Sequence, residues 1–189
     1  MGRRVATAVG FGMTTVNHDL EALADPFKVR AHRLVELLER EGLPFQVFET
    51  RRSFSRSAEL YMQGRAVVAG VVTKVGPTVT NAGAGSSPHN WGLAVDCILV
   101  TKDHDWWHGH EIDLPTGAWD TGYEKGRLIR PIVKLAWERY ARAVKTVDCV
   151  WGGGWTGFPD FPHCEHPQWQ TLRPANWKPI AQREVEAGR

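Results

Sequence analysis

The chain has 189 residues, with 23 Lys and Arg against 21 Asp and Glu and a formal net charge of +2. This length suits a single domain whose core needs no disulfide framework. The small positive charge is not the concentrated basic stripe of a nucleic-acid-binding surface. No stretch reaches the roughly 18–20 apolar residues of a transmembrane helix. We therefore expect a protein that binds no nucleic acid and makes no stable membrane insertion.

The cysteines and the N-terminus bear on where the protein is made. Cys97, Cys149 and Cys164 are odd in number and form no C-x-x-C pair, which favours buried free thiols over a disulfide. The opening "MGRRVATAVGFGM" imitates a secretory signal, but glycines and Thr7 interrupt its apolar run and it lacks a convincing A-x-A cleavage site. We expect no signal peptide, synthesis in the cytoplasm and a loose N-terminal start.

The first half of the chain predicts two helices around a strand. Residues 25–42, "DPFKVRAHRLVELLEREG", have near-helical apolar spacing and a stop at Gly42. The positions expected to face the core are Phe27, Val29, Leu34, Leu37 and Leu38. The alternating "LPFQVFET" predicts a strand. Residues 53–64, "SFSRSAELYMQG", predict a helix capped by Ser53 or Ser55 and ended by Gly64. Its expected inward positions are Ala58, Leu60 and Tyr61.

The second half predicts a strand, a long loop and a helix. Residues 67–91 begin strand-like and become a loop rich in Gly, Ser and Pro, and "GLAVDCILV" at 92–100 is the strongest strand signal. Residues 101–125 form a long polar and aromatic loop, and residues 126–147 a helix that bends or starts at Pro131. A short strand "HCEH" follows at 163–166, and the segment from Leu172 onward is expected to pack poorly.

Asp96 is the anomaly in the strongest strand, because an ionised carboxylate in an apolar strand is costly unless a cation or a hydrogen-bond network compensates it. Strand alternation puts Asp96 on one face with the small Ala94, which leaves room for an ion. His89 lies upstream, and Gly92 gives the chain freedom to fold back so that the imidazole reaches the same ion. A satisfied polar network is the alternative for this pair.

Further ligands would come from one of two histidine groups. His163 follows Asp160 by three residues in "PDFPHCEH", so a carboxylate would lie beside the metal if the flanking prolines impose a bend. Asp160 could instead form a turn or orient a ligand. Glu165 and His166 are rivals for base and ligand. The other group lies in the long loop, and its histidines are expected to be exposed: His104, His108 and His110.

An ordered set of motifs resembles the LAS metallopeptidases. "SSPHNWGLAVD" matches S-x-H-x-x-G-x-A-x-D from Ser87 to Asp96, and "DFPH" at 160–163 matches the D/E-x-x-H element of that superfamily. The likeness is strongest to the L-alanyl-D-glutamate peptidase branch, whose "RS", "LYxQGR", "TNA" and "WGGDW" elements appear here in order as Arg52-Ser53, "LYMQGR", "TNA" and "WGGGW". It covers roughly residues 20–168.

The resemblance implies a role for each matched residue. It makes His89, Asp96 and His163 the ligands of Zn²⁺, Asp160 the general base, and Arg52 the group that steadies developing negative charge. A surface position beside Arg51 is the alternative for Arg52. The expected substrate contacts are Ser87, Ser57 and Trp91.

Three positions depart from the branch pattern and bear on the substrate. Ser57 stands where the branch usually has glutamine, Gly154 replaces the aspartate of "WGGDW", and Cys164 replaces an aromatic residue. None of these removes a ligand or the base.

We therefore expect an α+β fold in which a small antiparallel sheet carries the zinc site and helices pack on its other face. Residues 1–170 would form one peptidase domain, and residues 171–189 a tail that is no separate domain. The resemblance implies a zinc metallopeptidase that hydrolyses a peptidoglycan stem peptide at L-Ala-D-Glu. It further implies a phage-type endolysin that reaches the cell wall after another protein permeabilises the membrane. We expect a monomer. The alternatives are a D-Ala-D-Ala carboxypeptidase or dipeptidase, and a non-catalytic zinc-stabilised wall-binding module.

Overall fold

The computed structural model describes residues 15–100, 121–124, 127–128 and 130–189. The α-helices in these ranges are α1 (Asp25–Arg40), α2 (Phe54–Met62), α3 (Pro131–Thr146), α4 (Trp169–Leu172) and α5 (Trp177–Glu186). The strands are β1 (Phe45–Glu49), β2 (Arg65–Val68), β3 (Val71–Lys74), β4 (Ala94–Leu99), β5 (Tyr123–Glu124), β6 (Arg127–Leu128), β7 (Val150–Trp151) and β8 (His163–Glu165). The 3₁₀ helices are η1 (Leu20–Ala22), η2 (Pro88–Trp91) and η3 (Gly152–Gly154).

The main sheet is antiparallel, with strand order β1-β4-β8-β7. β4 pairs with β1 on one side and with β8 on the other, so the strand that carries Asp96 is central. In this register Asp96 lies opposite His163 on β8 and opposite Glu49 on β1. The expected α+β fold with a small antiparallel sheet is confirmed.

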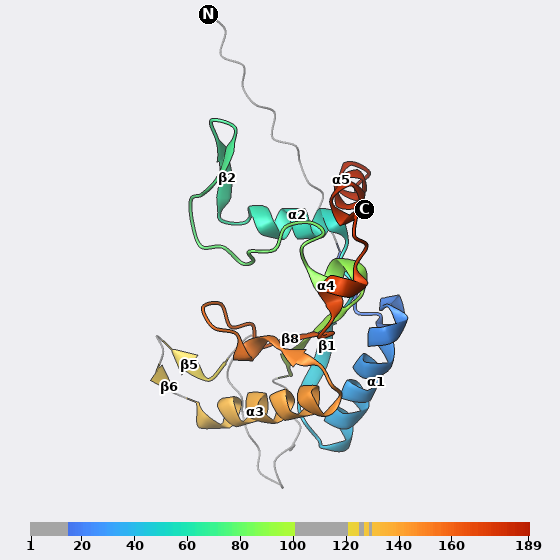
Figure 1. The fold of residues 1–189 in the computed structure, drawn as a ribbon. Helices are drawn as coiled ribbons and strands as arrows, with labels where there is room; N and C mark the ends of the chain where they lie inside the picture. The colour runs from blue at the N-terminus through green and yellow to red at the C-terminus, as the bar shows by residue number, and fades with distance from the viewer. Residues whose placement is uncertain (1–14, 101–120, 125–126, 129) are drawn as a thin grey trace, which may run out of the picture.

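One face of the sheet is apolar and packs on α1 and α3, which lie together on one side of it (Figure 1). Strand alternation places Val95, Cys97 and Leu99 in this core, as the sequence predicts. The helix residues that complete it include Phe27, Leu34, Val133, Trp137 and Tyr140. The prediction for Val29 is wrong, because its side chain lies on the outer face of α1 and is 55% exposed.

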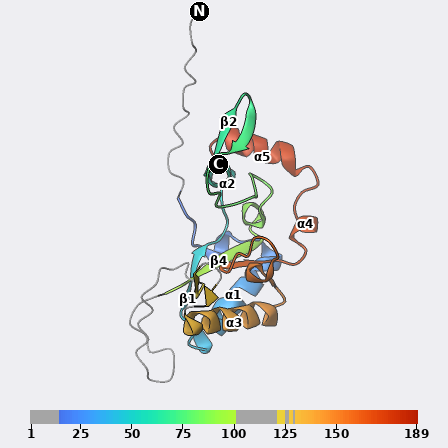
Figure 2. The same ribbon diagram turned by 90° about the vertical axis from the view of Figure 1, so that its left-hand side faces the viewer.

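α2, α5 and the β2–β3 hairpin lie on the opposite side of the sheet from α1 and α3 (Figures 1 and 2). Ser53 caps α2 by accepting a hydrogen bond from the backbone N–H of Arg56, as predicted. The expected inward positions Ala58, Leu60 and Tyr61 are only half-buried. The buried residues of this helix are instead Phe54, Ser55 and Ser57.

The segment after Leu172 forms helix α5, which contacts α2, and only one of its residues is buried. Ala181 of α5 is 4% exposed. The backbone N–H of Ser55 donates to the carbonyl of Arg189 over 2.8 Å, which ties the end of the chain to α2. Gly85, in the loop before η2, allows α5 to lie close, since a Cβ on it would lie 2.7 Å from Ala181 Cβ. The division at residue 170 stays a prediction.

The cysteines and the helices bear on two expectations drawn from the composition. Cys97, Cys149 and Cys164 are free thiols, and two of them are buried. In the ranges that the structure describes, every helix is too short or too polar to cross a membrane. The predicted loop at 101–125 falls largely on residues 101–120, which lie outside the described ranges, and with it His104, His108 and His110.

Tyr140 joins α3 to the segment that leads into β8. It is fully buried, and its hydroxyl donates to the carbonyl of Pro162 over 2.9 Å. We expect Tyr140→Phe to reduce the free energy of unfolding by about 1 kcal/mol, because the carbonyl loses a buried donor. The corresponding fall in Tm is about 2–4 °C for a chain of this size. Thermal and urea denaturation check this, and an unchanged stability would show that the hydrogen bond contributes nothing net.

Candidate metal centre and active site

A 3₁₀ turn presents His89 to the central strand. Pro88 begins η2, and Gly92 ends it at φ 67°, a left-handed conformation that favours glycine. The chain also passes close at this point, since a Cβ on Gly92 would lie 2.8 Å from the backbone nitrogen of Ala24. Only two residues separate the η2 turn from strand β4. The predicted fold-back of His89 toward Asp96 occurs.

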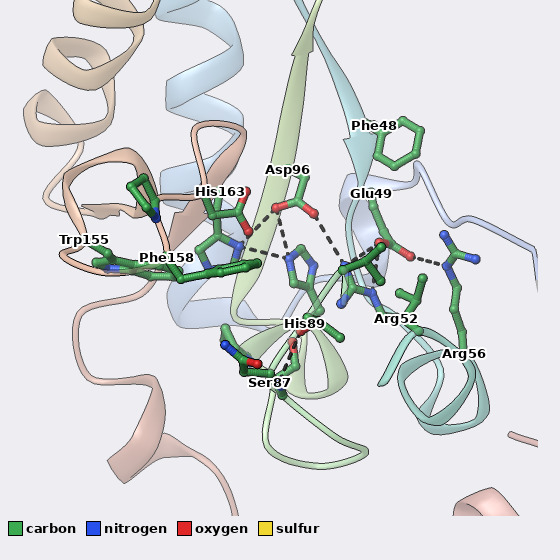
Figure 3. Close-up of a pocket in the computed structure, with 18 of the residues that line it drawn as sticks. Phe48, Glu49, Arg52, Arg56, Ser87, His89, Asp96, Trp155, Phe158 and His163 are labelled. Atoms are coloured by element: carbon green, nitrogen blue, oxygen red, sulfur yellow. Dashed lines mark hydrogen bonds and ion pairs between the residues drawn. The ribbon is translucent and has the colours of Figure 1, made fainter. Parts of the chain in front are cut away.

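Three buried side chains converge on one point. His89 Nε2 lies 3.2 Å from Asp96 Oδ1, His163 Nδ1 lies 3.0 Å from the same oxygen, and the two nitrogens are 3.2 Å apart. A tetrahedral zinc with bonds of about 2.0–2.2 Å separates its ligand atoms by about 3.3–3.6 Å. The triangle is close to three corners of such a tetrahedron, and the chemistry of two imidazoles and one carboxylate fits zinc (Figure 3).

The outer ring nitrogen of each histidine has a fixed acceptor. His89 Nδ1 lies 2.7 Å from the carbonyl of Thr50, so this nitrogen carries the proton and Nε2 presents its lone pair to the cluster. His163 Nε2 lies 3.1 Å from Glu165 Oε2, so its Nδ1 faces the cluster. Glu165, weighed in the sequence as a rival base, contacts the back of His163 instead. The other rival, His166, accepts from the backbone N–H of Gln168.

The cluster favours a positive charge at its centre, whether a proton or a metal ion. Burial by itself raises the pKa of Asp96, but His89 and His163 outweigh it and hold that pKa well below its usual range. Burial lowers the pKa of His163, but hydrogen bonds to Asp96 and Glu165 outweigh it and raise that pKa to about 10. A proton or a metal ion held between the two imidazoles and Asp96 therefore supplies the compensation that the sequence predicts for this buried carboxylate.

A bend brings Asp160 to the same site. The backbone N–H of His163 donates to the carbonyl of Asp160 over 3.2 Å, which is the turn that the flanking prolines require. Gly152 makes room for it, since a Cβ there would lie 2.6 Å from the carbonyl oxygen of Asp160 and 2.8 Å from His163 Cβ. Burial, and after it the charge of Asp96, raises the pKa of the Asp160 carboxyl above its ordinary value. Asp160 is thus a stronger base than an exposed carboxylate.

Arg52 is not a surface residue, because Glu49 and Asp96 bind it at the cluster. Its Nε and Nη2 donate to Glu49 Oε2 over 2.9 and 2.5 Å, and Nη2 lies 3.5 Å from Asp96 Oδ2. Arg56 Nε donates to the other oxygen, Glu49 Oε1, over 2.6 Å. Sequence reasoning missed Glu49. The available signal was a carboxylate at the end of an apolar strand next to two arginines.

The expected substrate contacts separate into two groups. Ser87 lines the cavity described below. Ser57 is buried and accepts a hydrogen bond from Asn90 Nδ2 over 2.8 Å, while Trp91 donates to the carbonyl of Gly85 and packs edge-on against Phe54. The structure therefore brings Ser87 to the cavity. Ser57 and Trp91 instead make contacts that hold α2, the η2 turn and the loop before it together.

The departures at Gly154 and Cys164 also have definite locations. Cys164 points into the apolar core, on the face of β8 opposite His163. A Cβ on Gly154 would meet nothing within 4 Å, so this position is open to a side chain.

A cavity of about 780 Å³ opens over the cluster. The charged side chains Glu49, Arg52 and Arg56 lie on one side of His89 and Asp96, and Trp155 and Phe158 lie on the other (Figure 3). Trp155 packs against His163, with ring centroids 5.1 Å apart. The cavity thus combines an ionic wall and an aromatic wall around the converging ligands. Its other lining residues include Phe48, Leu60, Val79, Asn81 and Pro159.

Comparison with known proteins gives three findings. A sequence profile of a family described as D-alanyl-D-alanine carboxypeptidase matches residues 80–166. The peptidoglycan L-alanyl-D-glutamate endopeptidase CwlK of Bacillus subtilis (strain 168) is 36% identical over 138 residues, which are 73% of this chain and 70% of CwlK. The solved structure of the L-Ala D-Glu endopeptidase ChiX of Serratia marcescens aligns with a TM-score of 0.44 and 21% identity, covering 82% of this chain and 87% of that chain.

Glu49 offers a test of the ionic wall. Burial raises its pKa, but the hydrogen bonds and charges of Arg52 and its neighbours outweigh burial and lower it. We expect Glu49→Gln to cost about 3 kcal/mol of unfolding free energy at pH 7, because two guanidinium groups lose their buried counter-charge. A lowered folded pKa gives stability that is present above the unfolded carboxyl pKa and lost as the pH falls through the folded value.

The difference between wild type and Glu49→Gln should therefore shrink between pH 5 and pH 3 in urea denaturation. Glu39→Gln, which changes an exposed carboxylate on α1, is the matched control and should alter stability little. A Glu49 effect that is the same at both pH values would contradict the ion-pair account.

Proposed function

Because the chain belongs to the D-alanyl-D-alanine carboxypeptidase family of peptidases, we propose that it is a zinc-dependent hydrolase of peptidoglycan stem peptides that cleaves the bond between L-alanine and D-glutamate. The observation that carries the proposal is the triangle of His89, Asp96 and His163 with Asp160 beside it in an open cavity. The choice of bond is supported by the 36% identity to CwlK, whose name states that specificity.

The proposed zinc ligands are His89 Nε2, Asp96 and His163 Nδ1. Zinc bound there supplies Lewis acidity toward the scissile carbonyl and makes water acidic enough to ionise near neutral pH. Thr50 and Glu165 keep both ring lone pairs aimed at the metal position. Three protein ligands, rather than four, would be typical of catalytic rather than structural zinc.

Asp160 acts as the general base in this proposal. Its carboxylate takes a proton from the attacking water and passes it to the nitrogen of the leaving D-glutamyl residue. The raised pKa of its carboxyl strengthens Asp160 as a base for the first transfer. Arg52, held at the edge of the cluster by Glu49, stabilises the negative charge that develops on the carbonyl oxygen. Ser87 contacts the substrate in the cavity.

The wider role stays a prediction. A protein that hydrolyses stem peptides acts at the cell wall. The motif resemblance supports a phage-type endolysin that is made in the bacterial cytoplasm and reaches the wall through a permeabilised membrane. A monomeric state is likewise a prediction.

The carboxypeptidase alternative is favoured by one specific finding, the description of the family profile. Mass spectrometry of the soluble products from purified peptidoglycan separates the two reactions. New N-terminal D-glutamyl groups mark the endopeptidase, whereas released D-Ala marks the carboxypeptidase. Wall binding without any product would favour a zinc-stabilised binding module.

Asp160→Ala tests the base in the same digestion. We expect the rate of product release to fall by about 10²–10⁴, because the attacking water loses its proton acceptor. Zinc affinity and Tm should change little, since Asp160 is not one of the proposed ligands. Asp148→Asn, at an exposed aspartate outside the cavity, is the control and should retain full activity. Full activity in Asp160→Ala would exclude this residue as the base.

Metal removal tests the centre itself. We expect a chelator to abolish hydrolysis and added zinc to restore it, and calorimetry to detect one zinc site per chain. Asp96→Asn should weaken zinc binding by more than about 100-fold, because the anionic ligand is lost. His32→Ala, at a half-exposed histidine on α1, is the control. Undiminished zinc binding in Asp96→Asn would place the metal elsewhere.

A further inference from the structure

The ionic wall of the cavity holds two guanidinium groups on one carboxylate. Glu49 is 1% exposed, and each of its oxygens accepts from a different arginine: Oε2 from Arg52 and Oε1 from Arg56. Both arginine side chains also line the cavity, where they are 11% and 17% exposed. Glu49 is thus shared by two guanidinium groups, and Arg52 also lies 3.5 Å from Asp96 Oδ2.

The position of Arg56 differs from that of Arg52. Arg52 reaches Asp96 Oδ2 and so borders the proposed reaction centre, whereas Arg56 lies on the far side of Glu49 (Figure 3). Its backbone N–H donates to the Ser53 cap at the start of α2, and its Nε is anchored on a buried carboxylate. Arg56 is therefore a fixed cation at a set distance from the cluster, and it has no part in the proton transfers described above.

The proposed substrate has an anionic group that no residue assigned so far recognises. A D-glutamyl residue contributes its nitrogen to the scissile bond and one carboxyl group to the rest of the stem. Its other carboxyl group is free and ionised at neutral pH unless it is amidated. This carboxylate lies within a few bonds of the leaving nitrogen, so it enters the cavity with the reacting bond. Arginine is the side chain best suited to bind a carboxylate by paired, charge-assisted hydrogen bonds.

We propose that Arg56, held beside Arg52 by Glu49, is a specificity-determining residue that binds the free carboxylate of the D-glutamyl residue and disfavours its carboxamide form. The inference rests on the proposed L-Ala-D-Glu cleavage. A carboxamide has no charge and turns an N–H₂ donor toward a wall of donors, so it leaves the guanidinium groups less well satisfied. On the opposite wall, the aromatic rings of Trp155 and Phe158 offer no guanidinium group with which to bind a carboxylate.

The test compares two synthetic stem tripeptides that begin with L-Ala-D-Glu and differ only in that the free D-glutamyl carboxyl is an acid or an amide. We expect wild-type protein loaded with zinc to cleave the acid with a kcat/KM about ten-fold or more above that of the amide. Arg56→Gln should bring this ratio close to one by slowing cleavage of the acid. Arg51→Gln removes the same charge from an exposed neighbour outside the cavity and should preserve the ratio.

A binding measurement and a conservative variant keep the result separate from misfolding. Calorimetric titration with the product dipeptide that begins with D-Glu should show weaker binding of the acid form to Arg56→Gln and unchanged binding of the amide form. Arg56→Lys retains a cation for Glu49 and should give an intermediate ratio with a wild-type Tm. The acid-to-amide ratio is the readout, and a purely structural defect would slow both substrates alike.

The outcomes distinguish the two levels of the proposal. Cleavage of neither peptide at L-Ala-D-Glu by the wild type would overturn the proposed function, and this inference with it. Cleavage of both peptides with the same ratio in wild type and Arg56→Gln would overturn this inference alone.

Discussion

The pairing of β4 between β1 and β8 is the constraint on which the site depends. It puts Asp96 directly opposite His163 on one neighbouring strand and opposite Glu49 on the other. Three ionisable groups from distant parts of the chain are thereby held in one row by backbone hydrogen bonds. A shift of one residue in either pairing would turn the partner side chain to the other face of the sheet. The placement of Asp96 beside His163 and Glu49 is thus a consequence of sheet register.

The two faces of the same strand have opposite energetic requirements. Val95, Cys97 and Leu99 gain free energy by packing on α1 and α3, and this packing holds β4 in place. On the other face, buried charge is tolerated because each group has a partner: Asp96 has two imidazoles, and Glu49 has two guanidinium groups. Unpaired burial of either carboxylate would be costly. By holding β4 in place, the apolar core keeps these charged groups next to their partners on the other face.

Loops at both ends of the sheet complete the cavity through close backbone approaches. Gly92 lets the η2 turn lie against the backbone before α1, and Gly152 lets the segment after β7 lie against Asp160 and His163. Asn90 holds the η2 turn to α2 by donating to Ser57 Oγ and to the backbone carbonyl groups of Arg52 and Ser53. The residues proposed for catalysis and specificity therefore come from loops and helix ends, while the sheet fixes their common origin.

The sequence by itself determined the local elements and the identity of the converging residues. Three features are not explained by packing and point to a shared polar or metal site: a carboxylate in an apolar strand, a histidine seven residues before it, and a D-x-x-H element. The family motifs contain these features in the same order. Helical and strand periodicity likewise predicted α1, β1, β4 and α3, because these patterns depend on neighbours along the chain.

Only the tertiary structure decided which groups surround those residues. Simple alternation would put Glu49 on the same face of β1 as Phe45 and Val47, in the core. The bulge between Val47 and Glu49 turns it into the cavity instead, where it binds Arg52 and Arg56. The packing of α5 on α2 and the contacts of Ser57, Trp91 and Glu165 are likewise long-range or depend on side-chain direction. A bulge, a register and a helix docking site are set by contacts between distant segments, and periodicity along the chain does not encode them.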